Sequence, residues 1–355
     1  MRYLIIKLGA IGDIVTTLPA ISAIRSDDTE ANITWVCGIP AASILETIPG
    51  IDEIIKVDET RLFRGSRLGR VAELLRVMAR LAGRRYDRIF TFYRDRRYQL
   101  LSALTFGPTR SFADDSHRPV AGRSRSWESV RFCLDLPQRL LPCPVLPAVQ
   151  WSINPLPNEL SAWRKDKPIV IVPGGAKNIL RDDALRRWPI ERYRAVAEAL
   201  IEQGYRVAIV GAPSDRWVQP YFEKLEVIDL VGMTSLPELL GLMQISALVI
   251  THDTGTAHLA RLANAPGITI FGPTNPEEVF GPIMWGDVPA EPRSVALWGG
   301  ANLSCRPCYD GRNYALCDDN LCMQGTPVNE VIQAAKKILT DWEKKDTTET
   351  GNGEG

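Results

Sequence analysis

The 355-residue sequence has no excess of either charge and no long apolar run. It contains 42 lysine and arginine residues and 42 aspartate and glutamate residues, a balance that argues against a general nucleic-acid-binding protein. No apolar stretch approaches the roughly 20 residues that a membrane-spanning helix needs. The opening residues 1–9 are too short for the apolar region of a signal peptide. We therefore expect a cytoplasmic globular protein without nucleic-acid partners.

Two ligand-binding motifs are also missing. Gly9 and Gly12 follow the first strand-like run with only Gly-x-x-Gly spacing, so the three-glycine dinucleotide fingerprint is absent. This disfavours a nicotinamide or flavin oxidoreductase. We also find no Asp-x-Asp pair placed to hold a divalent metal.

Strand-like apolar runs alternate with helical patterns along the whole chain, which predicts α/β architecture with parallel sheets. Each half predicts its own doubly wound unit, and the proline-rich segment 140–157 resists regular structure and marks the junction. We place a first domain at 1–155, a second at 165–325, an amphipathic helix at 326–345 and a disordered tail at 346–355. The predicted strands are 3–8, 33–37, 54–57, 88–92, 169–172, 207–210, 227–230, 248–250, 268–271 and 295–298.

The functional hypothesis starts from one strand-to-helix turn in the second half. An apolar run ends at Asp253, and a helical pattern starts near Thr256. Thr254, Gly255 and Thr256 then lie at a helix N-terminus, where free amides and the helix dipole favour a diphosphate. Asp253 can accept hydrogen bonds from hydroxyl groups, and His258 faces the same pocket. The alternative is an ordinary capped helix without a ligand.

Two more turns of this kind follow predicted strands of the same half. Gly174 and Gly175 let the backbone approach phosphate, with Lys177 nearby as a cation. Arg186 precedes a proline that suits the first turn of a helix, and Asp215 follows the next strand. Three such turns in one domain predict a nucleotide site.

In the first half, Asp13 lies at the turn between the opening strand and the helix that follows it. Ligands of open α/β sheets bind at this carboxyl edge. The functional interpretation makes Asp13 a general base in an interdomain cleft. The alternative makes it an N-terminal helix cap, for which aspartate is a favoured residue.

Residues 61–100 contain twelve arginines but only Glu73, Asp87 and Asp95 as acidic residues, a local charge of +9. Such a patch attracts a phosphorylated acceptor or an anionic membrane surface. The alternative is a solvated helix surface, because arginine is a good helix former.

Four cysteines cluster late in the chain with the spacing Cys-x2-Cys-x8-Cys-x4-Cys: Cys305, Cys308, Cys317 and Cys322. Four thiolates can hold zinc or iron tetrahedrally and staple a polar loop, so a structural metal is one hypothesis. The alternative is four reduced cysteines in a compact loop.

Taken together, several short motifs resemble glycosyltransferase family 9, the bacterial lipopolysaccharide heptosyltransferases. The similarity runs from the first strand to about residue 340, with the motifs in the right order. They are Ile-Ile-Lys-Leu-Gly-Ala-Ile-Gly-Asp13, Arg186-Arg-Trp-Pro189, Gly211-Ala-Pro, Asp253-Thr-Gly-Thr-Ala-His258 and Phe271-Gly-Pro-Thr274.

The resemblance implies a GT-B fold, two Rossmann-like domains facing a central cleft, with an acceptor-binding first domain and a last helix that crosses back onto it. It implies inverting transfer of heptose from an ADP-sugar to a sugar hydroxyl of a phosphorylated glycolipid, at the inner face of the inner membrane and without a catalytic cofactor. By position, Asp13 matches the general base, Arg186 the diphosphate-binding cation and Asp215 a ribose contact. The donor-binding turn matches Asp253, Thr254, Gly255 and His258.

Two departures concern the donor. The loop 174–185 is longer than in the heptosyltransferases, and aspartate replaces glutamate at position 215. One alternative is therefore a transferase of this fold with another nucleotide sugar or a non-lipopolysaccharide acceptor. A second alternative is a non-catalytic nucleotide-binding protein.

Overall fold

The structure is a computed structural model. It describes residues 1–113, 124–134, 144–146, 167–177, 182–281, 284–285, 288–289, 294–299, 303–309 and 314–350, with side chains up to residue 340. The chain divides into two compact units. The first contains 1–151, 178–181 and 277–290, and the second contains 152–177, 182–276 and 291–355.

The first unit is built on a five-stranded parallel sheet with the strand order β3-β2-β1-β4-β5. This is the start of the doubly wound order 3-2-1-4-5-6, in which the chain reverses direction across the sheet beside the first strand. The strands are β1 (Arg2–Ile6), β2 (Asn32–Gly38), β3 (Glu53–Val57), β4 (Arg88–Thr91) and β5 (Thr109–Ser111).

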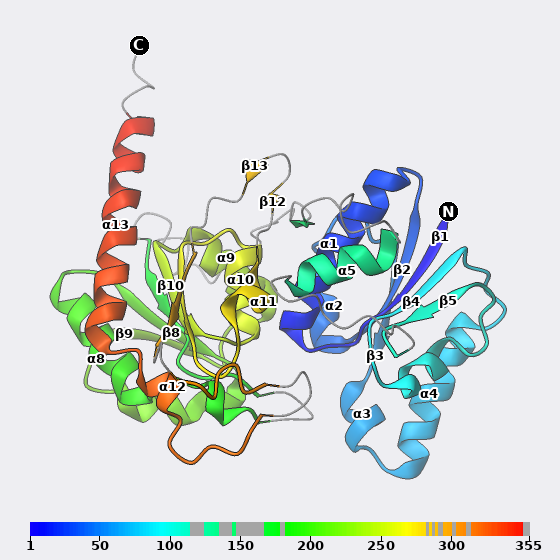
Figure 1. Cartoon of the computed structure of the whole chain (residues 1–355), viewed down its shortest axis with the longest axis horizontal. Coiled ribbons are helices and arrows are strands. Elements are labelled where there is room, and N and C mark those ends of the chain that lie inside the picture. Colours follow the sequence, from blue (N-terminus) through cyan, green and yellow to red (C-terminus); the bar gives the residue numbers. More distant parts are fainter. Residues whose placement is uncertain are drawn as a thin grey trace. The chain divides into compact units, whose positions relative to one another are not determined.

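Both faces of this sheet are buried, as the apolar sequence of its strands requires. Successive side chains of β1 alternate between the faces: Leu4 and Ile6 belong to one cluster with Val77 of α4. Tyr3 stacks on Phe90 on the other face, where α5 contributes its aromatic side chains. Figure 1 shows helices on both sides of the sheet. They are α1 (Ile11–Asp27), α2 (Ile39–Leu45), α3 (Glu59–Arg64), α4 (Arg67–Leu81), η1 (Arg96–Ser102) and α5 (Arg125–Leu134).

A small three-stranded sheet, which the sequence did not predict, also belongs to the first unit. A strand of the amino-terminal half pairs with one strand of the segment 277–290, which pairs in turn with a second strand of that segment, so the chain returns to the first unit late in the sequence. Its strands are β6 (Val145–Leu146), β12 (Met284–Trp285) and β13 (Val288–Pro289), preceded by α11 (Pro276–Phe280).

The second unit is built on a six-stranded parallel sheet of order β14-β11-β10-β7-β8-β9. Numbered from its own first strand, this is the full order 3-2-1-4-5-6. Both sheets therefore agree with the predicted doubly wound units, and all ten predicted strands are confirmed. The strands are β7 (Ile169–Ile171), β8 (Val207–Gly211), β9 (Val227–Val231), β10 (Leu248–His252), β11 (Gly267–Phe271) and β14 (Ser294–Trp298).

One face of this sheet packs against α8 and the last helix, α13. Tyr193 and Leu200 of α8 share a core with Val331, Ala335 and Leu339 of α13. The helices are η3 (Ala184–Arg186), α8 (Ile190–Glu202), η4 (Pro213–Tyr221), α9 (Leu236–Ile245), α10 (Gly255–Leu262), α12 (Leu321–Gln324) and α13 (Val328–Thr350).

Helix α13 packs on the second unit, because its described apolar side chains lie in the core of that unit. The crossing of the helix 326–345 back onto the first domain, which the resemblance implied, stays a prediction. Thr326 anchors the start of α13, because its carbonyl accepts hydrogen bonds from the Trp188 indole and the Arg192 guanidinium. Helix α13 also continues to Thr350, into the segment 346–355 predicted as disordered. Residues 351–355 lie outside the described part of the chain.

The predicted domain junction at 140–157 lies mostly outside the described residues, and the two units divide at Trp151. Among the residues described above, no helix is long and apolar enough to cross a membrane.

The packing of α13 can be tested at Leu339, whose side chain is 2% exposed. We expect Leu339→Ala to lower the free energy of unfolding by about 2–5 kcal/mol, because it leaves a cavity in the core of the second unit. Urea unfolding followed by circular dichroism measures this. Leu316→Ala, at a fully exposed leucine, is the control and should cost less than about 0.5 kcal/mol. Equal effects at both positions would contradict the packing described here.

Candidate active site

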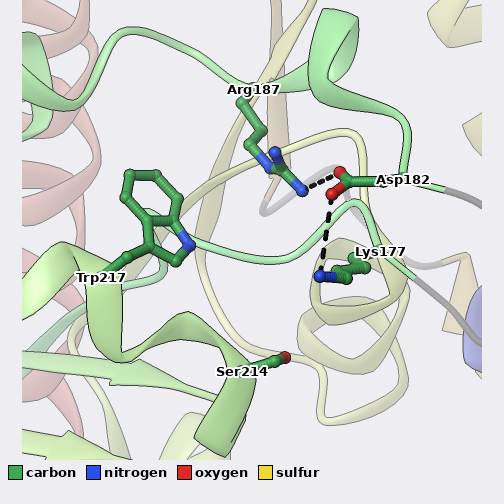
Figure 2. Close-up of a pocket in the computed structure, with 5 residues that line it drawn as sticks. All are labelled: Lys177, Asp182, Arg187, Ser214 and Trp217. Atoms are coloured by element: carbon green, nitrogen blue, oxygen red, sulfur yellow. Dashed lines mark hydrogen bonds and ion pairs between the residues drawn. The ribbon is translucent and has the colours of Figure 1, made fainter.

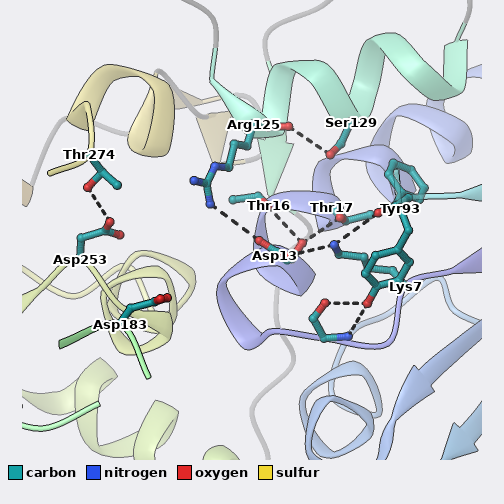
Figure 3. A network of polar contacts seen from close by, with 12 residues as sticks. Lys7, Asp13, Thr16, Thr17, Tyr93, Arg125, Ser129, Asp183, Asp253 and Thr274 are labelled. Carbon is teal, nitrogen blue, oxygen red and sulfur yellow. Dashed lines mark hydrogen bonds and ion pairs between the residues drawn. The ribbon is translucent and has the colours of Figure 1, made fainter. Parts of the chain in front are cut away.

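The candidate residues of the first unit lie where the strand order reverses, between β1 and β4. Ligands of doubly wound sheets bind beside the carboxyl ends of strands at this point. Asp13 is in the first turn of α1, which follows β1. Its carboxylate accepts a hydrogen bond from Lys7 Nζ at 2.9 Å, and Arg125 Nη1 lies 3.7 Å from its second oxygen. Figure 3 shows both cations directed at Asp13.

This geometry excludes one of the two interpretations of Asp13, the helix cap. The N-cap of α1 is Ala10, and it makes no side-chain capping bond, so Asp13 is not the helix cap. Its side chain is 40% exposed and therefore open to solvent despite the two cations. The backbone carbonyl of Asp13 accepts bonds from the hydroxyls of Thr16 and Thr17, which secure this turn. The carboxylate is thus held in place and accessible, as a general base must be.

Lys7 and Tyr93 support this turn from beneath. Lys7 is 7% exposed, and its ammonium lies 4.2 Å from the centre of the Tyr93 ring. The Tyr93 hydroxyl accepts hydrogen bonds from the amides of Leu8 and Gly9 and donates one to the Gly9 carbonyl. Burial raises the pKa of Tyr93 well above its ordinary value, so the hydroxyl keeps the proton that it donates. The backbone between β1 and α1 is therefore fixed by a side chain that follows β4.

Glu59 is a second carboxyl group at the same turn. A Cβ atom on Gly9 would lie 3.2 Å from its carboxylate, and one on Gly38 would clash with it. Burial raises the pKa of Glu59, and the nearby Lys7 ammonium opposes this only in part. A buried carboxyl with a raised pKa is typical of acid–base sites and of packed structural carboxyls alike.

In the second unit, hydrogen bonds join the loops that follow three neighbouring strands. After β7, the Gly175 amide donates to Asp215 and the Ala176 amide donates to the Thr254 hydroxyl. After β8, the Ala212 amide donates to the other oxygen of Asp215. The predicted donor residues therefore do meet at one sheet edge, where the strand order reverses between β7 and β10.

Asp215 is mostly covered by protein: it is only 4% exposed, and each carboxylate oxygen accepts a backbone amide, at 3.1 and 2.9 Å. A carboxylate held this way organises the loops. The ribose contact that the resemblance implied stays a prediction. The loop requires glycine at both positions. A Cβ on Gly174 would lie 2.6 Å from Asp215 Cγ, and Gly175 has φ +90°, which favours glycine.

Asp253 and Arg186 form a buried polar cluster next to these loops. Asp253 is 3% exposed and accepts a hydrogen bond from the Thr274 hydroxyl at 2.7 Å, as Figure 3 shows. Arg186 lies 3.5 Å from Asp253 and 3.1 Å from Asp183. Burial opposes the charged form of Arg186, but the carboxylates, chiefly Asp253, raise its pKa. The Arg186 Nε atom is buried without a partner among the described residues, so this cation has donor capacity left.

Helix α10 starts at Gly255 with Thr254 as N-cap. The Thr254 side chain makes no capping bond to the helix, because its hydroxyl accepts the Ala176 amide. Gly255 and Thr256 are partly exposed, which leaves the helix N-terminus open to an anion. His258 is 5% exposed, so it is mostly covered by protein and only marginally presented to a ligand.

A cavity of about 280 Å³ opens beside the Gly175 loop. Figure 2 shows Asp182 between two cations, Lys177 and Arg187, with the Trp217 indole on the other side. The Arg187 guanidinium lies 5.9 Å from the Trp217 ring and donates from Nε to the Gly175 carbonyl. The remaining lining residue is Ser214. Lys177 is thus placed near the loop, as predicted, and shares a carboxylate with Arg187.

The four cysteines do not form a ready metal site as placed. Cys305 and Cys317 are exposed, whereas Cys322 is buried. The Cys322 thiol donates to the Asn320 side chain, and the Cys317 sulfur accepts the Asn320 amide. Within the described ranges, no three His, Cys, Asp or Glu side chains gather to hold a metal ion. A structural zinc or iron stays a prediction, which elemental analysis of the purified protein tests.

Several site residues were not predicted from the sequence. Lys7 had a detectable signal, because a lysine at the end of an apolar strand can be buried only if a partner compensates its charge. The sequence carried no such signal for three others, because each reaches the turn after β1 from a distant part of the chain: Arg125, Tyr93 and Glu59. Trp217 likewise carried no motif.

The fold and these sites define a class of protein: two doubly wound α/β units, each with polar residues at its strand reversal. The solved structure of Escherichia coli heptosyltransferase WaaC with ADP has this fold. It superposes with a TM-score of 0.67 over 95% of this chain and 100% of that one, at 19% identity. The predicted GT-B fold is confirmed.

The sequence comparisons identify the family. Residues 147–314 match the model of glycosyltransferase family 9 (heptosyltransferase). Lipopolysaccharide heptosyltransferase 3 of Escherichia coli is 23% identical over 92% of this chain and 96% of that protein. Lipooligosaccharide heptosyltransferase 2 of Haemophilus influenzae is 38% identical over 99 residues, which span 29% of that protein and 26% of this chain. These matches place residues 147–314 in glycosyltransferase family 9.

The raised pKa of Glu59 predicts a pH-dependent stability. The folded state holds the Glu59 proton more firmly than the unfolded state, so its contribution is largest below the ordinary pKa of 4.5 and is lost as pH rises through the folded pKa. Glu59→Gln cannot ionise. We expect it to raise the melting temperature at about pH 8 and not at about pH 4. Glu30→Gln, at an exposed position, is the control and should change neither value. A uniform shift at both pH values would refute the burial effect.

Proposed function

We propose that the chain is an inverting glycosyltransferase that moves heptose from an ADP-activated donor to a sugar hydroxyl of the lipopolysaccharide inner core. The observation that carries the proposal is Asp13, an accessible carboxylate held in the first turn of α1 by Lys7, in a chain that matches glycosyltransferase family 9. The relatives, which are lipopolysaccharide and lipooligosaccharide heptosyltransferases, supply the heptose and the lipopolysaccharide acceptor. The ADP complex of WaaC supplies the nucleotide.

The donor diphosphate is assigned to the second unit. The amides at the start of α10, from Gly255 and Thr256, supply hydrogen-bond donors and the positive end of the helix dipole. Arg186 supplies a fixed positive charge, and its Nε donor is the one left without a partner among the described residues. Lys177 and Arg187 add cations at the neighbouring cavity. Asp253 is assigned to hold Arg186 in place as well as to accept donor hydroxyls.

The chemistry follows from these assignments. The acceptor oxygen attacks the anomeric carbon from the face opposite the diphosphate while Asp13 accepts its proton. The bond between the anomeric carbon and the diphosphate oxygen breaks, and its electron pair leaves with ADP. The charge that develops on the diphosphate is stabilised by Arg186 and by the amides at the start of α10. The reaction requires that Asp13 and these groups act on the same pair of substrates.

We further propose that transfer needs no divalent metal ion. The leaving diphosphate requires positive charge, and Arg186 with the α10 amides can provide it without one. Nucleotide release in the presence of EDTA tests this proposal: unchanged turnover supports it, and loss that is restored by added magnesium contradicts it.

The acceptor is proposed to be a phosphorylated glycolipid, reached by peripheral contact with the inner membrane from the cytoplasmic side. The charge of the first unit supports this, because residues 61–100 carry twelve arginines and three acidic residues. Incubating the protein with several nucleotide sugars and the glycolipid, and measuring nucleotide release, tests donor and acceptor together. Binding of nucleotide without release in any combination would favour the non-catalytic alternative.

The base assignment predicts the behaviour of Asp13→Asn. The amide keeps the shape of the carboxylate but cannot accept the proton, so we expect turnover to fall by about 10²–10⁴-fold. The affinity for ADP, measured by calorimetry, should stay within about twofold because Asp13 is not assigned to the donor. Asp318→Asn, at an exposed position, is the matched control. Near-native turnover of the Asp13 variant would remove this residue from the chemistry.

The cation assignment predicts the behaviour of Arg186→Ala. Loss of charge-assisted hydrogen bonds to the diphosphate should weaken ADP binding by about 10–100-fold. Because the variant also leaves Asp183 and Asp253 unpaired, its melting temperature is measured in parallel, and binding is compared below the onset of unfolding. Arg194→Ala removes an arginine that pairs with Glu198 on helix α8, and it should bind ADP normally. Equal ADP affinity of both variants would exclude Arg186 from the donor site.

A further inference from the structure

Helix α4 of the first unit has apolar side chains on two opposite faces. Val77 and Leu81 are fully buried in the core cluster that includes Leu4 and Ile6. Leu68 is 84% exposed, Val71 53% and Leu75 55%. At 100° per residue, Leu68 and Leu75 point almost directly away from Val77. Ala72 and Ala79 are exposed on the same side. We call Leu68, Val71, Ala72, Leu75 and Ala79 the outer stripe.

Packing in the core of the first unit does not explain why the outer stripe is apolar, because the side chains of the stripe are exposed to solvent. A solvated helix normally carries polar side chains on the face opposite its buried stripe. Leucine and valine at successive turns of this face therefore indicate a surface that binds another molecule or a membrane.

Arginines surround the outer stripe. Residues 61–85 contain eight arginines and a single acidic residue, Glu73. Arg76 pairs with Glu73, and Arg80 and Arg84 pair with Glu53. By contrast, three exposed arginines near the start of the stripe form no ion pair within the part of the chain that the structure describes: Arg61, Arg64 and Arg67.

A second exposed apolar group lies at the other end of α4. Phe106 is 58% exposed and Leu104 is 49% exposed. The Gly83 amide, just after α4, donates to the Leu104 carbonyl, and the Phe106 amide donates to the Arg84 carbonyl, so this group adjoins the end of the helix. The Arg85 guanidinium lies 5.7 Å from the Phe106 ring. Apolar side chains beside arginines therefore occur at both ends of α4, which Figure 1 labels together with α3.

We propose that the outer stripe of α4 and the arginines beside it form the surface with which the protein docks on an anionic lipid bilayer. Leucine and valine enter the boundary between headgroups and acyl chains, while Arg61, Arg64 and Arg67 contact headgroup phosphates. A second copy of the chain is a poorer occupant, because it would bring the same positive charge to the contact. A nucleic acid matches the charge but leaves the apolar stripe uncovered.

The inference deepens the proposed function by naming its membrane-facing surface. It uses the acceptor's lipid nature only as context, and vesicle binding can be measured without donor or acceptor. Failure of the surface and failure of the transferase proposal are therefore separate results.

The test is co-sedimentation of the full chain with vesicles. One set contains phosphatidylglycerol and phosphatidylethanolamine, and the other contains phosphatidylcholine alone. We expect binding to the anionic vesicles only, weakened by salt. Replacing two apolar residues, Leu68→Ser with Leu75→Ser, should weaken binding at least about tenfold, and Arg64→Ser with Arg67→Ser should do the same and reduce the salt dependence.

Matched controls come from the second unit. Met233→Ser with Leu316→Ser removes two exposed apolar side chains, and Arg206→Ser with Arg216→Ser removes two exposed arginines. Both controls should bind vesicles like the native chain. With detergent-dispersed acceptor, the stripe variant should release nucleotide at the native rate, because it lies outside the assigned site.

Three results would overturn the proposal. Vesicle binding of the stripe and arginine variants could equal that of the controls, or the native chain could bind both vesicle types alike. Alternatively, the native chain could ignore vesicles and form dimers that Leu68→Ser with Leu75→Ser dissolves, which would make the stripe a contact between copies.

Discussion

The carboxylate of Asp215 is the constraint on which the donor half of the site depends. It is almost fully buried, and it accepts the amides of Gly175 and Ala212, which follow two neighbouring strands. Losing a charged acceptor from a buried amide costs on the order of 1.5–3 kcal/mol. The Thr254 hydroxyl extends this link to a third strand through the Ala176 amide. The loops after β7, β8 and β10 therefore keep one arrangement, which leaves the start of α10 open.

In the first unit, the turn that carries the candidate base is held in place by a hydroxyl group and a buried cation. The turn between β1 and α1 is held by the Tyr93 hydroxyl, which bonds to both amides and the carbonyl of that turn. Lys7 lies between Tyr93 and Asp13, so one buried cation joins the support of the turn to the candidate base. A site that must present a carboxylate at a defined position benefits from such a rigid base. Glu59 fills the remaining space below Gly9 and Gly38 at the expense of some stability at neutral pH.

The outer stripe of α4, on the surface of the first unit, is not built from buried polar groups as the two sites are. The outer stripe is apolar and exposed, and its nearest arginines have no carboxylate partners in the described structure. The sequence indicated the excess of arginines but could not separate those that pair with Glu53 and Glu73 from those that remain available. The ion pairs of the folded chain made this separation, and burial separated the apolar residues, because α4 presents Val77 and Leu75 to opposite sides.

The sequence by itself determined most of the local structure, but not β5 or the small three-stranded sheet. Apolar runs and turn residues located all ten predicted strands, and the strand-to-helix turns placed Asp13, Gly174, Gly175 and Thr254 at the carboxyl edges of their sheets. These features depend on neighbours a few residues apart, which periodicity reveals.

Only the tertiary structure decided the partners. Asp215 meets Gly175 across 40 residues, Thr254 meets Ala176 across 78, and Tyr93 meets Gly9 across 84. The packing of α13 on the second unit belongs with them, since an amphipathic helix shows which face it buries but not against what. Contacts over such separations arise from the order of strands in the sheet, and local pattern carries no record of that order.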